Sequence, residues 1–190
     1  GKAIQMNSPI HFCTGYLAAR ALGYREHRFE AVYVAAAAYA PDVDSLLSRF
    51  SPLFSHGIWT HTLAGVAVMS LIMASCTAAI LAAFRITPRP KYGVLVGLAL
   101  LGGVTHLFLD AFTYYESEAD ALHHLYFWPF WKFPWHINTV FPGVSYGVRI
   151  GVEVLYSLSV ALYILGYQWF YRGQNPLRMF HPRNGFRESK

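Results

Sequence analysis

Residues Thr62 to Phe84, reading TLAGVAVMSLIMASCTAAILAAF, decide the fold because these 23 residues include no Asp, Glu, Lys or Arg. A helix of this length is roughly 34 Å long at 1.5 Å per residue, enough to cross the hydrocarbon core of a membrane. Tyr92 to Leu109 adds 18 uncharged residues, and Ile150 to Tyr171 carries one charged residue, Glu153. These three stretches predict membrane-spanning helices.

The composition of the whole chain agrees with this reading. Of its 190 residues, 55% are hydrophobic and 13% are charged, against about a quarter charged in soluble domains. Pro9 to Gly23 and Ala31 to Ala40 are shorter apolar stretches that predict a helical hairpin packed against the three spans. We therefore expect an all-α, polytopic membrane bundle of about five helices, forming a single domain over residues 1–190. Gly1 to Gln5 are expected to be an expression remnant or a processed start, with no cleavable signal sequence before the first helix.

The basic residues predict the orientation of this bundle. If the five helices alternate in direction, 11 of the 15 Lys and Arg residues fall at one face, including a basic tail over residues 172–190. By the positive-inside rule this face is cytoplasmic, in a bacterial or archaeal plasma membrane, and the loop over residues 113–147 is extracytoplasmic. The topology also explains the net charge of +5, so no nucleic-acid partner is expected.

In this topology most histidines and several aspartates reach the extracytoplasmic face. His106 and Asp110 are four residues apart, so on a helix they share a face and can coordinate one ion. Ionisable groups inside a span are costly, which favours a functional role for this pair. The full set of predicted metal ligands is His11, Asp42, Asp44, His56, His61, His106 and Asp110.

The ligand types predict the metal. Mixed His and carboxylate donors suit Zn²⁺, with Mn²⁺ or Fe²⁺ as alternatives, better than Mg²⁺ or Ca²⁺. Because zinc usually takes three or four protein ligands, seven candidates predict two or three ions. Taken singly, Asp42 and Asp44 after Pro41 also suit a helix-cap turn, and His56 and His61 also suit surface positions.

Several of these residues and their neighbours resemble the motifs of the membrane-bound, metal-dependent hydrolases of the YdjM type, described as inner-membrane hydrolases. The resemblance covers about residues 6–113, and its motifs are His11 with Gly15, Pro41 to Asp44, His56 to His61, and Gly103 with His106 to Asp110. That family is similar to zinc-dependent phospholipase C and P1 nuclease, whose three-zinc sites use a His-x-x-x-Asp pair. The resemblance implies that His106 and Asp110 bind metal, with Asp110 as a bridge between ions. Gly57 and Ile58 replace the family's usual Arg-Gly, so a phosphate-clamping Arg is not implied here.

The outer loop contains an aromatic segment, Tyr126 to Trp135, with seven aromatic residues in ten. We favour an aromatic anchor at the membrane interface, and a groove for a lipid chain beside the metal site is the functional alternative. Flanking residues predict either interfacial polar positions or a second metal site: His123, His124 and His136, with Glu116 or Glu153.

Together these patterns predict a metal-dependent hydrolase acting on a lipid headgroup, preferably at a phosphoester. The metals would lower the pKa of a bound water and polarise a phosphoryl or acyl oxygen. Asp42, Asp44 or Glu153 would act as general base. The alternatives are a metal-ion or proton-coupled transporter, because intramembrane His and Asp also mark ion paths, and a non-catalytic protein with a structural metal site.

Overall fold

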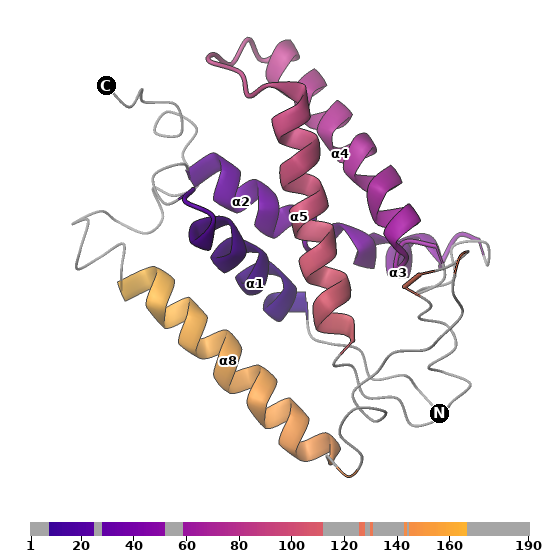
Figure 1. Cartoon of the computed structure of the whole chain (residues 1–190), viewed down its shortest axis with the longest axis vertical. Helices are drawn as coiled ribbons and strands as arrows, with labels where there is room; N and C mark the ends of the chain where they lie inside the picture. The colour runs from indigo at the N-terminus through magenta and orange to yellow at the C-terminus, as the bar shows by residue number, and fades with distance from the viewer. Residues whose placement is uncertain are drawn as a thin grey trace.

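The computed structural model describes residues 8–24, 28–51, 59–111, 126–127, 130, 143 and 145–166. Within these ranges it contains six α-helices, one short 3-10 helix and no strand (Figure 1). In chain order the helices are α1 (Ser8–Ala21), α2 (Arg28–Ala37), η1 (Ala40–Val43), α3 (Asp44–Leu47), α4 (Leu63–Ala83), α5 (Tyr92–Asp110) and α8 (Tyr146–Gly166). The prediction of an all-α protein is confirmed.

Helices α4 and α5 form an antiparallel hairpin and agree within one residue at each end with two of the predicted spans (Figure 1). Among the described helices, these two are long and apolar enough to cross a membrane. Helix α1 has 14 residues and α2 has 10, and the apolar part of α8, Ile150–Gly166, falls short of the same length. Two candidate spans are thus established, and the five-helix membrane bundle stays a prediction.

Helices α1, α2 and α5 pack against one another, α4 covers α5, and α8 lies along α1. The core between α1, α2 and α5 includes buried Tyr16, Ala19, Val34, Leu95 and Leu98. Small residues at such contacts let the helix backbones approach closely. In lipid the hydrophobic effect does not draw helices together, so this close packing supplies the stabilising energy.

Helix α8 is joined to α1 by a hydrogen bond between the hydroxyls of Thr14 and Tyr156, which are 2.9 Å apart. The two helices run in the same direction in Figure 1. One turn toward the N-terminus of each helix stand His11 and Glu153, and both are buried. The register therefore brings these two residues to the same level of the bundle.

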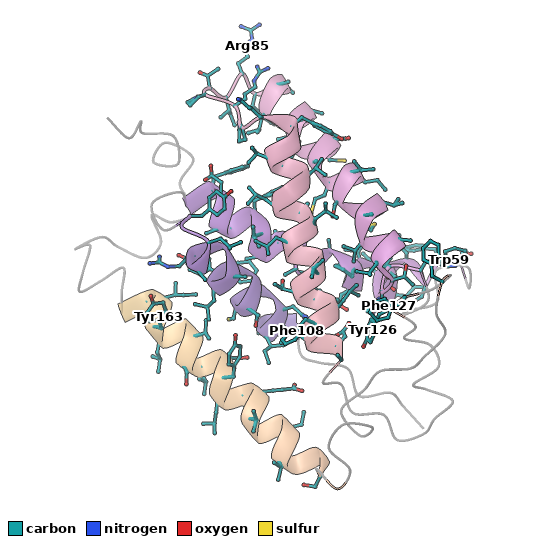
Figure 2. All side chains as sticks on the ribbon, viewed as in Figure 1. Trp59, Arg85, Phe108, Tyr126, Phe127 and Tyr163 are labelled. Carbon is teal, nitrogen blue, oxygen red and sulfur yellow. The ribbon has the colours of Figure 1, made fainter. Side chains whose placement is uncertain are left out.

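The two ends of the α4–α5 hairpin differ in character. The connecting turn carries Arg85, Arg89 and Lys91, whereas the opposite end holds Trp59, Tyr126 and Phe127 (Figure 2). The backbone nitrogen of Leu63 donates to the carbonyl of Tyr126 at 2.9 Å, which ties the start of the aromatic segment to α4. The rest of that segment, apart from Phe127 and Phe130, lies outside the described residues.

Candidate metal centre

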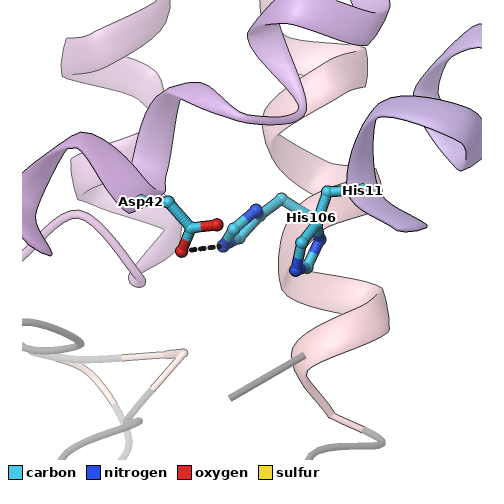
Figure 3. A group of neighbouring side chains, drawn as sticks. All are labelled: His11, Asp42 and His106. Atoms are coloured by element: carbon cyan, nitrogen blue, oxygen red, sulfur yellow. Dashed lines mark ion pairs between the residues drawn. The ribbon is translucent and has the colours of Figure 1, made fainter. Parts of the chain in front are cut away.

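Five ligand-type side chains converge at the aromatic end of the hairpin. His11 comes from α1, Asp42 from η1, His61 from the turn before α4, and His106 and Asp110 from the last turns of α5. The three histidines and Asp110 are at most 5% exposed, and Asp42 is partly buried. Figure 3 shows His11 and Asp42 on either side of His106. So many ionisable groups are costly to bury unless they compensate one another or bind an ion.

His106 is oriented by the end of α2. Its Nδ1 lies 2.8 Å from the carbonyl oxygen of Ala38. A carbonyl only accepts hydrogen bonds, so this contact places the proton of a neutral imidazole on Nδ1 and leaves a lone pair on Nε2. The contact needs close packing of α5 on α2: a Cβ added to Gly102, one turn earlier, would lie 2.5 Å from the carbonyl oxygen of Val34.

His61 is oriented by its neighbours in the same way. The hydroxyl of Thr60 donates to Asp44 Oδ2 and lies 2.9 Å from His61 Nδ1, which is itself 3.4 Å from that carboxylate oxygen. With the hydroxyl hydrogen committed to Asp44, Thr60 and Asp44 both present acceptors to Nδ1, so the proton of a neutral ring sits there. Nε2 of His61 therefore also carries a lone pair.

The turn that carries His61 is itself fixed on α4. Thr62 caps the helix by accepting a hydrogen bond from the backbone nitrogen of Gly65 at 2.9 Å. A Cβ at Gly65 would lie 1.8 Å from the carbonyl oxygen of Trp59, so only glycine lets the turn fold this closely over the first turn of α4. The cap and the close approach together hold His61 at the end of the α4–α5 hairpin where the ligand-type side chains converge.

The donor atoms have the spacing of a metal coordination shell. Nε2 of His61, Nε2 of His106 and Oδ2 of Asp110 are separated by 3.1, 3.3 and 2.9 Å. Oδ1 of Asp42 lies 3.6 Å from the first nitrogen and 3.7 Å from the second. Ligands bound tetrahedrally at 2.0–2.1 Å are about 3.3 Å apart, so the atoms of His61, His106 and Asp110 have the spacing of three ligands of one zinc ion, with Asp42 beside the two nitrogens.

The chemistry of the four atoms also favours a positive charge between them. When both imidazoles are neutral, two of the atoms are imidazole lone pairs and two are carboxylate oxygens, so all four are acceptors that face one another. Oδ2 of Asp110 is buried without a hydrogen bond of good geometry. Imidazole nitrogens and carboxylate oxygens are ligands of divalent transition-metal ions, so the residues present fit a bound metal ion.

His11 extends the centre on the other side of Asp110. Its Nε2 lies 3.5 Å from Asp110 Oδ1, and its ring stacks on that of His106 at a centroid distance of 4.0 Å. Single donor atoms of His11, Asp42 and His106 all lie within 4.8 Å of one another, as do those of His61, His106 and Asp110. The two oxygens of Asp110 thus face different histidines, the arrangement of a bridging carboxylate.

The electrostatics at the two groups outside the spans agree with a cation site. Burial lowers the pKa of His61, but its hydrogen bonds with Asp42 and Asp44 and the charge of Asp110 outweigh burial and raise the pKa to about 10. Burial raises the pKa of Asp42, but the hydrogen bond with His61 and the charges of His106 and His11 leave it below its usual value. The surrounding carboxylates favour positive charge at this point, either a proton or a metal ion.

The structure brings five of the seven predicted ligands together, and a sixth, Asp44, adjoins the imidazole of His61 at Nδ1. The seventh, His56, lies outside the described residues, as do His123, His124, His136 and Glu116. Glu153, predicted as a general base, is buried on α8 and belongs to neither group of converging donors. Sequence reasoning missed the Ala38 carbonyl, and it included Thr60 only as a residue of the His56 to His61 motif, without a role. Only Thr60 had a signal, its place beside His61.

Comparison with known proteins gives one match. The model of the YdjM inner membrane protein family matches residues 6–174 of the chain. Neither the curated proteins nor the solved structures contain a match.

Proposed function

The chain belongs to the YdjM inner membrane protein family, and from this membership and the converging donors we propose that it is a membrane-embedded, metal-dependent hydrolase. The observation that carries the proposal is the set of three atoms from His61, His106 and Asp110 that lie 2.9–3.3 Å apart, with Asp42 beside the two nitrogens. We propose Zn²⁺ as the ion, with Mn²⁺ or Fe²⁺ as alternatives, because nitrogen and oxygen donors are mixed. The substrate class is a lipid headgroup phosphoester.

We propose two ions with different coordination. His61, His106 and Asp110, with Asp42 beside them, would hold the first ion, and His11 with Oδ1 of Asp110 would hold the second. Fewer protein donors face the second position, so it keeps sites open for substrate, as catalytic zinc sites do. A divalent ion supplies Lewis-acid chemistry that suits a phosphoryl group.

The remaining carboxylates take different roles in this proposal. Asp44 holds the imidazole of His61 through Nδ1, together with Thr60, and is therefore a positioning residue. Glu153 is a buried carboxylate that neither binds the first ion nor positions a ligand in this proposal. Its register on α8 puts it level with His11. We assign it the role of general base, which accepts the proton of the attacking water.

The membrane setting supports a lipid substrate. The donors lie at the ends of two apolar helices long enough to cross a membrane, and the basic α4–α5 turn is at their other ends. By the positive-inside rule the centre then faces the extracytoplasmic side. A phosphoester at the headgroup level of a bilayer can reach that depth without leaving the membrane.

A direct assay tests the proposal. The purified protein, stripped of metal by a chelator, is incubated with mixed phospholipid vesicles, with and without added Zn²⁺, Mn²⁺ or Fe²⁺, and products are identified by mass spectrometry. We expect headgroup cleavage only with metal, and its loss in His106→Ala but not in Thr105→Ala. Thr105 is a matched control because its hydroxyl bonds to the carbonyl of Gly102 and offers the centre no donor. Bound metal without lipid cleavage, together with ion flux into vesicles, would replace the hydrolase with a transporter.

A further inference from the structure

We propose that an apolar groove between α3 and α4 holds the first part of one acyl chain of a membrane phospholipid, with the headgroup beside His61 at the edge of the metal centre. The inference deepens the proposed hydrolase function and rests on it. The groove has a volume of about 560 Å³. Its apolar lining comes from Val43 and Leu47 on one side and Ala64, Val68 and Met69 on the other.

The groove is polar at one end only. Asp44, Thr60 and Thr62 line this end, and the first two contact His61 at Nδ1, across the ring from its donor nitrogen Nε2. The groove extends along α4 from Thr62 to Met69, which is seven residues or roughly 10 Å at 1.5 Å per residue. A ligand that fits this gradient has a polar head at the metal end and a hydrocarbon chain along α4.

The apolar end of the groove is continuous with the surface of α4 that faces outward. Val68 is 57% exposed, and the residues one turn further on, Leu71 and Ile72, are also about half exposed. Helix α4 is a candidate membrane span in an inner membrane protein, so this surface borders lipid acyl chains. A chain can therefore enter the groove sideways from the bilayer.

The groove suits part of one chain. Its lining extends roughly 10 Å along α4, which is shorter than an extended membrane acyl chain. The rest of that chain and the second chain of a diacyl lipid would remain in the bilayer.

A neighbouring cavity provides a matched control. It has a volume of about 340 Å³ and lies between α4 and α5, where Leu63, Val104, Phe108 and Phe127 line it. Val104 is 46% exposed, comparable to Val68, so a bulky side chain at either position can be accommodated without disturbing the packing between the helices. Val68→Trp fills the groove, and Val104→Trp fills the control cavity.

The test uses vesicles of phosphatidylethanolamine with a photoreactive diazirine in the half of one acyl chain nearer the headgroup. After illumination, labelled peptides are mapped by mass spectrometry in the wild type, Val68→Trp, Val104→Trp and His106→Ala. We expect labelling concentrated on the groove residues of α3 and α4, abolished by Val68→Trp and unchanged by Val104→Trp. The wild-type map is informative even if a variant fails to fold. Labelling spread evenly over the exposed faces of α4 and α5, or unaffected by Val68→Trp, would overturn the inference.

The same experiment separates this inference from the proposed function. Chain binding needs no metal, so His106→Ala should keep the groove labelling while it loses lipid cleavage. Groove labelling without cleavage of any lipid by the wild type would leave the groove as a lipid site and reject the hydrolase. Cleavage without groove labelling would support the hydrolase and reject the groove as a lipid site.

Discussion

Gly102→Ala should weaken metal binding although Gly102 contributes no ligand. The added Cβ would lie 2.5 Å from the carbonyl oxygen of Val34 and 2.7 Å from atoms of Ala37 and Ala38. Ordinary contact begins at 3.4 Å, so α5 and α2 must separate by about 0.9 Å. That shift would stretch the 2.8 Å hydrogen bond from His106 Nδ1 to the Ala38 carbonyl beyond hydrogen-bond range. Loss of such an orienting bond typically costs about 10- to 100-fold in metal affinity, and the overpacking costs about 1–3 kcal/mol in stability.

Gly97→Ala is the matched control, because Gly97 lies on the same helix and a Cβ there meets nothing within 4 Å. It should bind metal as the wild type does and gain up to about 1 kcal/mol from helix propensity. Affinity is measured in detergent by competition with a chromophoric chelator, and stability by thermal unfolding. Wild-type affinity in Gly102→Ala, or an equal loss in both variants, would refute the coupling of helix packing to His106.

Three further variants test individual roles. Thr60→Val removes the hydroxyl that links Asp44 to His61, so metal affinity should fall by about 10- to 100-fold in the same competition assay; unchanged affinity would mean that something else orients the ring. His11→Ala should reduce metal from two ions per chain to one by elemental analysis, since only the second ion uses it; two retained ions would remove His11 from the centre. Glu153→Gln should keep both ions but slow headgroup cleavage by about 10² to 10⁴, and normal turnover would end its assignment as the base.

The sequence predicts the helical elements of this fold well where apolar runs are long. The bounds of α4 and α5 follow from uncharged runs, because a charge inside a span is costly and marks its end. The short segment α3 was not expected, since four residues are too few to produce a periodic pattern. The second helix, predicted over Ala31 to Ala40, ends earlier at Ala37, and Pro41 lies in the first turn of η1.

Residue types and spacing located the candidate centre but not its internal arrangement. The i, i+4 spacing of His106 and Asp110 was enough to pair them on one helix face. Whether Asp44 faces an ion or the far nitrogen of His61 depends on the turn at Thr60, which requires coordinates. The Ala38 carbonyl left no sequence signal at all, because every residue has one.

The central claim is that the side chains around His106 bind metal, and the most direct test is the metal content of the purified protein. Elemental analysis by mass spectrometry should find two divalent ions per chain in the wild type and in Thr105→Ala, and a large loss in His106→Ala, because His106 belongs to both groups of converging donors. Equal metal in the wild type and His106→Ala, or none in the wild type after growth with added zinc, manganese and iron, would contradict the account.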